Sequence, residues 1–309
     1  MSRRGWLLFL TIGLVWGIPY LLIKVAVGSF SPATVVFMRT AIGALVLLPI
    51  TAARGELTPV LRHWRALLLF TVIEVTGPWF LLSDAERRLT SSLSGLLVAA
   101  VPLVGALLVW ATGGDERVGV RRLAGLLVGL AGVAVLVGFD VGGSDLGAAG
   151  EIALVTVGYA TGPLIIVRRM QGLPATGVVT AAFCITAAAY AAPAILQLPH
   201  AAPAGGPIAA AIVLGLVCTA FAFPVFFALI REVGPVRATV VTYINPAVAV
   251  LTGVVILHEP FSASTGAGFV LIIAGSFLST RRQQPAATPP RGAIGRASPL
   301  REEDVVAPS

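Results

Sequence analysis

Long apolar segments recur along the whole chain and constrain its fold more than any other feature. A membrane-spanning helix needs about 20 mostly apolar residues. Ten segments of the 309-residue chain come close to this length: 6–27, 33–52, 66–83, 91–111, 123–139, 148–167, 175–197, 208–230, 236–257 and 262–280. The connections are short, so helices that are neighbours in sequence must run antiparallel. The sequence therefore predicts an all-α integral membrane protein with ten transmembrane helices.

The composition agrees with a chain that lies in lipid. Only 11% of the residues are charged and 57% are hydrophobic, whereas soluble domains carry about 25% charged residues. These polar side chains are too few to cover a water-soluble globule of this size. A net charge of +7 would suit nucleic acid in a soluble protein. Here the arginines lie in short clusters between apolar segments, so we expect contact with membrane lipids and no nucleic-acid partner.

The arginine clusters also predict the orientation. If the N-terminus lies in the cytoplasm, the inner segments hold seventeen Arg residues and the outer segments hold only Arg87 and Arg88. Cytoplasmic loops carry an excess of Lys and Arg, so we expect both termini on the inside of a bacterial-type inner membrane. Residues 283–309 are rich in Pro, Ala and Arg and cannot bury apolar area. We expect them to form a disordered cytoplasmic tail.

The two halves of the apolar region resemble each other. Short motifs recur at separations of 142–144 residues: Pro19 with Pro163, Pro32 with Pro174, Pro102 with Pro246, Gly125 with Gly268, and Gly132 with Gly275. We therefore expect two five-helix repeats, residues 1–143 and 144–282. Five is an odd number, so the second copy must be inverted in the membrane. Inverted repeats that rock around a central site are typical of secondary transporters.

Glycine spacing indicates close helix packing in the last helix of each repeat. Gly125 and Gly132 are seven residues apart, as are Gly268 and Gly275. This spacing places both glycines of a pair on one helix face, where a neighbouring helix can approach closely. Packing within the chain is the first interpretation. A homodimer contact is the second.

Glu74 is the single residue that says most about function. It lies near the middle of the third predicted span, where an ionised carboxylate costs about 3 kcal/mol or more unless it is paired or hydrated. A carboxyl group in this place suits proton coupling or contact with a substrate. The structural alternative is a hydrogen bond to a neighbouring helix, or an ion pair with Arg39 or Lys24.

Aromatic and polar side chains on the first, third, sixth and ninth spans form a second group of candidates. The group consists of Trp16, Trp79, Tyr159, Tyr243 and Asn245. Such residues can line an amphipathic pocket in which aromatic faces contact an organic substrate and an amide supplies a hydrogen bond. Trp and Tyr also form ordinary belts at the membrane interface. The depth of Trp16 within its span favours the pocket.

One further cation and several prolines complete the candidate site. Arg39, in the second span, has three interpretations: it reaches the headgroups, it neutralises a carboxylate, or it binds an anionic group of the substrate. Proline within a helix removes a backbone donor and frees a carbonyl. The repeat-related prolines are therefore candidates for hinges beside the site, with static kinks as the alternative. They are Pro19, Pro102, Pro163 and Pro246.

Several motifs give the chain a resemblance to a known family. They are Trp16-Gly17, Pro32 followed by Arg39, the stretch from Ala85 to Pro102, and the stretch from Thr242 to Gly275 with Pro246, Glu259 and Pro260. With these motifs the sequence resembles the EamA family of the drug/metabolite transporter superfamily. The resemblance implies a ten-helix, two-repeat carrier that exports small metabolites, including amino acids and related compounds. It also implies a cavity lined by helices 1, 3, 4, 6, 8 and 9. For Glu259, in an outer connection, we expect a loop or capping role instead of substrate binding.

Motifs for other kinds of chemistry are missing from the sequence. It has no Gly-rich phosphate loop with Lys, and its three histidines, His63, His200 and His258, are too scattered for a metal site. We therefore expect no cofactor, no metal and no enzymatic activity. The leading hypothesis is a secondary transporter that exports small metabolites by alternating access, with proton coupling through Glu74 as one energy source. The alternatives are a membrane enzyme that acts on lipid-linked substrates and a passive channel or scaffold.

Overall fold

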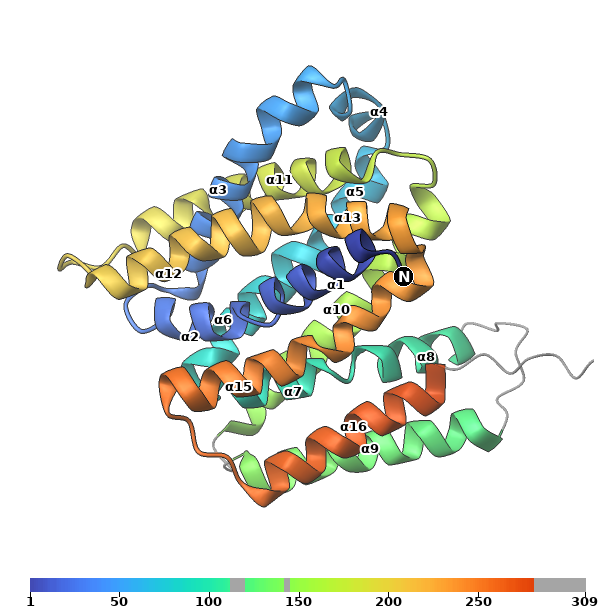
Figure 1. The fold of residues 1–309 in the computed structure, drawn as a ribbon. Coiled ribbons are helices and arrows are strands. Elements are labelled where there is room, and N and C mark those ends of the chain that lie inside the picture. The colour runs from blue at the N-terminus through green and yellow to red at the C-terminus, as the bar shows by residue number, and fades with distance from the viewer. Residues whose placement is uncertain (112–119, 142–144, 281–309) are drawn as a thin grey trace, which may run out of the picture.

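The computed structural model describes residues 1–111, 120–141 and 145–280 and shows a bundle of helices (Figure 1). In this part of the chain nine helical segments are long and apolar enough to cross a membrane, and Ala263–Ser279 is a shorter apolar helix. The predicted all-α membrane fold is confirmed. The predicted tail, 283–309, lies outside the described residues.

Five of the ten predicted spans are single continuous helices. They are α3 (Pro32–Ala53), α9 (Val120–Asp140), α10 (Leu146–Arg169), α11 (Ala175–Leu196) and α16 (Ala263–Thr280). Four of them pack in pairs: α9 lies along α16 and α3 lies along α11. Figure 1 shows the α9–α16 pair at one side of the bundle.

The other five spans are each interrupted. In chain order they are α1 (Arg3–Val15) with α2 (Pro19–Ala26); α5 (Trp64–Phe70) with the π-helix η1 (Thr71–Thr76) and α6 (Gly77–Arg88); α7 (Ser91–Val98) with α8 (Val101–Ala111); α12 (Gly205–Gly215) with the π-helix η3 (Leu216–Phe221) and α13 (Ala222–Val233); and α14 (Pro235–Ala238) with the 3₁₀-helix η4 (Thr239–Tyr243) and α15 (Asn245–Leu257). A short helix, α4 (Leu57–Arg62), precedes α5.

Proline accounts for the interruptions. A proline lies within the first three residues after each break: Pro19, Pro78, Pro102, Pro224 and Pro246. Proline has no N–H to donate to the carbonyl four residues earlier, so the preceding turn widens, tightens or ends. The two π-helices begin 145 residues apart in the sequence, at Thr71 and Leu216. Pro163 differs from the other hinge candidates because α10 continues through it.

The third span is longer than the hydropathy pattern predicts. We expected it to end at residue 83, but α6 continues to Arg88. The charged residues of its last turns are therefore helical. Asp84 accepts hydrogen bonds from Arg87 and Arg88 within this helix, at 3.3 Å and 3.1 Å. Charged side chains that pair with one another end an apolar segment without ending the helix.

Glycines hold α9 and α16 together. The backbone of Gly125 meets Gly275, and that of Gly132 meets Gly268, so the two helices run antiparallel. A methyl group on Gly132 would come 2.8 Å from the amide nitrogen of Ile272 and 2.9 Å from the carbonyl oxygen of Gly268. These glycines face each other inside the chain. They are therefore not available for the homodimer contact that we considered from the sequence.

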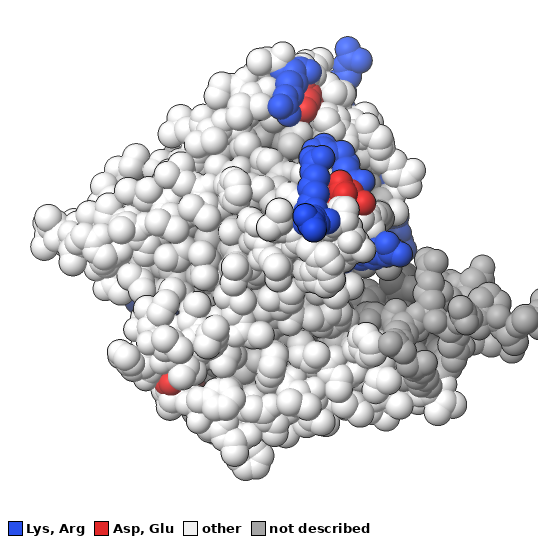
Figure 2. Space-filling view, in the orientation of Figure 1, with Lys and Arg blue, Asp and Glu red and all other residues white. Residues whose placement is uncertain are grey.

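Charge is distributed unevenly over the surface. Figure 2 shows Lys and Arg side chains gathered at the end of the molecule where Figure 1 marks the N-terminus, while the broad apolar flank is almost free of charge. Large exposed apolar side chains of the described residues include Leu45, Leu130 and Val270. An apolar flank with charged ends is the surface that a multi-pass protein presents to a bilayer.

We expect Gly132→Ala to lower the midpoint of thermal unfolding, because the new methyl group would push the backbones of α9 and α16 apart. Overpacking of this kind costs about 1–3 kcal/mol. The matched control is Gly138→Ala in the same helix, where an added methyl group has no neighbour within 4 Å. Unfolding of both variants in detergent can be followed by tryptophan fluorescence. Equal midpoints for the two would contradict the glycine contact.

Candidate functional site

Arg39 lies at the centre of the bundle and is held by uncharged groups. Its side chain on α3 is only 7% exposed. Its Nε donates a hydrogen bond of 2.9 Å to Oγ1 of Thr219, and its guanidinium lies 3.5 Å from the ring centroid of Trp79. A cation over the face of a tryptophan is attracted by the negative face of the ring. Arg39 therefore neither reaches the headgroups nor neutralises a carboxylate through an ion pair in the part of the chain described here.

The π-helix η3 places the partner of Arg39. The hydroxyl of Thr219 donates 2.9 Å to the carbonyl oxygen of Leu214, five residues earlier, and accepts from Arg39. The side chain of Thr219 thus joins the backbone of α12 to the guanidinium of Arg39. π-turns of this kind are frequent at functional sites. The π-helix therefore carries the acceptor that orients the guanidinium.

Aromatic rings connect two of the predicted site residues. Trp79 on α6 lies 5.6 Å from Phe183, which lies 5.3 Å from Phe223, and Phe223 lies 5.5 Å from Trp16 at the end of α1. Trp16 also lies 4.6 Å from Phe226. Ring separations of this size are those of favourable aromatic pairs. The structure therefore places Trp16 and Trp79 on one continuous aromatic wall.

Tyr159 joins this wall from α10. Its hydroxyl lies near Trp79 and within electrostatic reach of Arg39, Glu74 and Glu86. The residue is half-buried and packs against both large hydrophobic clusters of the bundle. Three of the predicted residues, Arg39, Trp79 and Tyr159, thus lie together.

Glu74 lies in η1 and points towards α10. Its carboxylate lies against Gly162, where even a methyl group would collide with it. Oε2 is buried and has no hydrogen-bond partner among the described residues. The ion pair with Arg39 or Lys24 that we considered is not formed: within the described chain neither cation has Glu74 as a salt-bridge partner. In the described part of the chain the half-buried Glu74 thus has no fixed partner for its carboxyl group.

Asn245 forms hydrogen bonds with backbone carbonyls at the break before Pro246. With the amide oriented so that its nitrogen faces the two acceptors, it donates 3.2 Å to the carbonyl oxygen of Gly13 and 3.1 Å to that of Val241. It therefore fastens α1 to the start of α15. Tyr243, half-buried in η4, lies at the same break. This position shows a structural task for Asn245 that the sequence did not reveal.

Glu86 on α6 is a functional candidate that sequence reasoning missed. It is completely buried, and neither carboxylate oxygen has a hydrogen-bond partner in the described part of the chain. Its charged neighbours are Lys24, Glu259 and Arg39. The sequence feature that could have identified Glu86 is the helical spacing of Trp79, Leu82, Glu86 and Leu89. This spacing continues one buried helix face past residue 83.

Lys24 and Glu259 satisfy helix ends near Glu86. The Nζ of Lys24 donates to the carbonyl oxygens of Glu86 and Leu89, each at 2.7 Å. Glu259 accepts from the backbone N–H groups of Ser91 at 2.7 Å and Ser92 at 2.9 Å, at the start of α7. A cation at a helix C-terminus and an anion at an N-terminus both follow the helix dipole. The capping role expected for Glu259 is confirmed.

We expect Thr219→Val to lower the midpoint of thermal unfolding more than Thr252→Val does. Thr219 is completely buried, and the change removes the acceptor of Arg39, which leaves a buried charged donor unsatisfied at a cost of about 1–3 kcal/mol. Thr252 is the control because its hydroxyl bonds only to carbonyls of its own helix, those of Val248 and Ala249. A smaller shift for Thr219→Val than for Thr252→Val would contradict the role of Thr219.

Comparison with known proteins identifies the family. The model of the EamA-like transporter family matches residues 3–138 and again 149–281. The uncharacterized transporter YvbV of Bacillus subtilis (strain 168) is 25% identical over 295 residues, 90% of this chain and 92% of that protein. The uncharacterized inner membrane transporter YedA of Escherichia coli (strain K12) is 28% identical over 253 residues, 78% of each chain.

A solved structure has the same fold. This crystal structure has a TM-score of 0.65 and 26% sequence identity, and the match covers 90% of this chain and 98% of that one. The two family matches together span nearly all of the described bundle. The chain is therefore a multi-pass membrane protein that belongs to the EamA-like transporter family.

Proposed function

We propose that the chain is a secondary transporter that exports small metabolites carrying a carboxylate, such as amino acids and related compounds, by alternating access around Arg39. The observation that carries this proposal is the buried guanidinium, held on Trp79 and Thr219 without an acidic partner in the described chain. Arg39, Trp79 and the completely buried Phe183 are closed off from solvent. This arrangement suits an occluded state of a carrier.

The geometry of Arg39 favours a carboxylate. Only its Nε has a hydrogen-bond acceptor among the described residues. The two terminal nitrogens of a guanidinium match the two oxygens of a carboxylate in a bidentate pair. The aromatic wall formed by Trp16, Phe223, Phe183 and Trp79 would contact the organic part of the substrate.

We also propose that the bundle consists of two inverted five-helix repeats, residues 1–143 and 144–282, with both termini in the cytoplasm. The family model matches the chain twice. The contacts between α9 and α16 are reciprocal: Gly125 meets Gly275, while its sequence counterpart Gly268 meets Gly132. An exchange of equivalent contacts is what a two-fold axis between the halves produces. The positive end in Figure 2 supports the orientation.

Two buried carboxyl groups support coupling to protons. Glu74 and Glu86 flank the Arg39 cluster, and both have buried oxygens without a hydrogen-bond partner in the described part. Ionisable groups inside a membrane protein commonly belong to ion pathways and proton relays. A membrane enzyme, the alternative from the sequence, is less favoured because the similar proteins are named transporters.

Counterflow in proteoliposomes tests the carrier and its cation together. Vesicles loaded with an unlabelled amino acid mixture should accumulate labelled amino acid transiently, because a carrier exchanges one substrate for another. Arg39→Lys should reduce this exchange at least tenfold, since an ammonium group cannot bind a carboxylate through two parallel bonds. Arg168→Lys, exposed at the end of α10, is the control. Flux without exchange would indicate a channel and overturn the proposal.

Glu74→Gln should abolish transport and leave folded protein in the membrane, because the amide keeps the shape of the side chain but cannot carry a proton. Glu86→Gln, measured beside it, shows which carboxyl group couples. The exposed Glu232→Gln is the control. Gradient-driven uptake and size-exclusion profiles give the two readouts. Normal flux in Glu74→Gln would remove Glu74 from the mechanism.

A further inference from the structure

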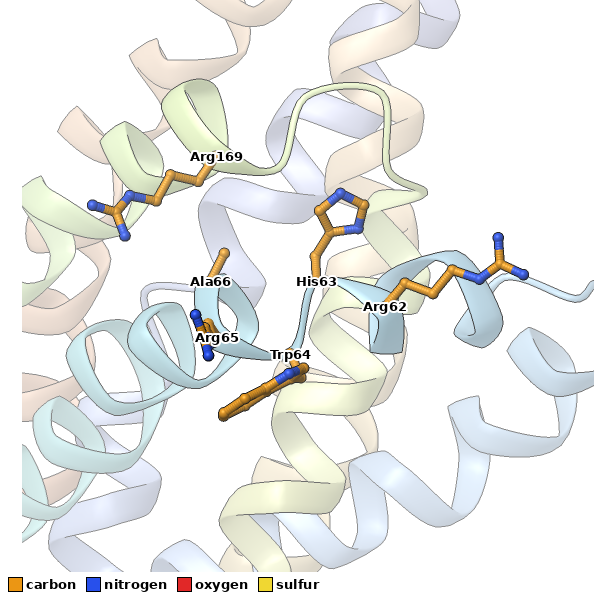
Figure 3. A pocket seen from close by; sticks show the side chains of 6 residues that line it. All are labelled: Arg62, His63, Trp64, Arg65, Ala66 and Arg169. Carbon is orange, nitrogen blue, oxygen red and sulfur yellow. The ribbon is translucent and has the colours of Figure 1, made fainter.

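A basic pocket lies away from the Arg39 cluster, at one end of the bundle (Figure 3). It has a volume of about 270 Å³, and its walls come from the turn between α4 and α5 and from the end of α10. The lining residues are Arg62, His63, Trp64, Arg65, Ala66 and Arg169. Figure 3 shows Arg62 and Arg169 on different helices with their guanidinium groups pointing away from each other, while Arg65 lies on the same side of His63 as Arg169 in this view.

The positive charge of this pocket is not balanced by the protein. Within the described chain none of its three arginines has a carboxylate within salt-bridge distance, whereas Arg54 and Arg88 pair with Glu56 and Glu151. Nδ1 of His63 lies 3.0 Å from the carbonyl oxygen of Pro59, which fixes the ring beside the arginines. Guanidinium groups from separate elements around one pocket are suited to a phosphate.

The surroundings place the pocket at the membrane interface. Trp64 is 54% exposed, and the adjacent helix surface carries the exposed apolar residues Leu61, Leu68 and Leu69. The guanidinium of Arg65 lies 5.3 Å from the ring centroid of Trp64. Tryptophan beside exposed leucines marks the level where lipid headgroups meet the acyl region. A phosphate at this level belongs to a lipid, and its acyl chains would cover the leucines.

We propose that this pocket binds the phosphate of an anionic phospholipid through Arg65 and Arg169, with Trp64 at the glycerol level. Basic pockets between membrane helices on the cytoplasmic side are suited to anionic headgroups. The orientation proposed above places the pocket in the inner leaflet. The inference does not depend on which substrate the chain transports.

The test is a lipid titration of the purified full-length protein in a neutral detergent, followed by thermal unfolding and native mass spectrometry. Phosphatidylglycerol should raise the unfolding midpoint and remain bound, whereas phosphatidylcholine should not. Arg65→Gln combined with Arg169→Gln should weaken phosphatidylglycerol binding about tenfold or more. Arg168→Gln combined with Arg231→Gln removes the same charge from exposed positions that do not line the pocket. This control should bind as the unchanged protein does.

Three results would overturn the proposal. Equal loss of binding in both double variants would show a general effect of charge. Equal stabilisation by inorganic phosphate and by phosphatidylglycerol would show a site for the free anion instead of the lipid. Unchanged binding in the pocket variant would place the lipid elsewhere. Because counterflow is measured separately, failure of this test is distinguishable from failure of the proposed transport function.

Discussion

Backbone groups freed inside a membrane must find partners within the protein, and this requirement governs how the bundle is assembled. Each interrupted span leaves carbonyls that lipid cannot satisfy. The hydroxyl of Thr219 bonds to Leu214, that of Tyr190 donates 3.1 Å to the carbonyl of Thr76, and Asn245 serves the break before α15. Tyr190 and Asn245 reach across to other spans. The breaks therefore act as points where separate helices are tied together.

The same requirement divides the bundle into stiff and adjustable parts. The continuous helices α9 and α16 meet backbone to backbone at Gly132 and Gly268, a contact that leaves little room for sliding. The interrupted spans also pack against one another, as α7 does against α15 at Gly95 and Ala249, but side-chain hydrogen bonds link them at their breaks. Breaking and re-forming those hydrogen bonds requires less free energy than separating a packed helix pair. In the alternating access proposed above, movement is therefore expected at the broken spans.

Hydropathy predicted the apolar helices of the described chain, nine of them long enough to cross a membrane and one shorter, because the lipid surrounds the whole length of a membrane helix. The break at Pro246 was also predictable from the sequence, because proline lacks a backbone donor. Trp16 and Trp79 could be chosen as candidates for the same reason, since the chemistry of tryptophan is fixed by the residue type. The direction in which a side chain points could not be predicted from the sequence in the same way. Glu86 was assigned to a loop because charged neighbours end the apolar run, yet it points into the bundle. Asn245 was assigned to a pocket, although two backbone carbonyls occupy its amide. The burial of Glu86 and the two bonds of Asn245 are tertiary contacts that arise only after packing.

The uncharged groups that hold Arg39 explain how a buried cation could bind the anionic substrate proposed above. An ion pair with Glu86 or Glu74 would neutralise the guanidinium, and a substrate would then have to displace a carboxylate. A ring face and a hydroxyl hold the group in position and leave its charge uncompensated. In a medium of low dielectric constant an uncompensated charge attracts an anion strongly. The protonation of nearby carboxyl groups would change this attraction. An ionised carboxylate competes with the substrate for Arg39, whereas a neutral acid does not. The position of Glu86 among Lys24, Glu259 and Arg39 suits it to such a change between loading and release.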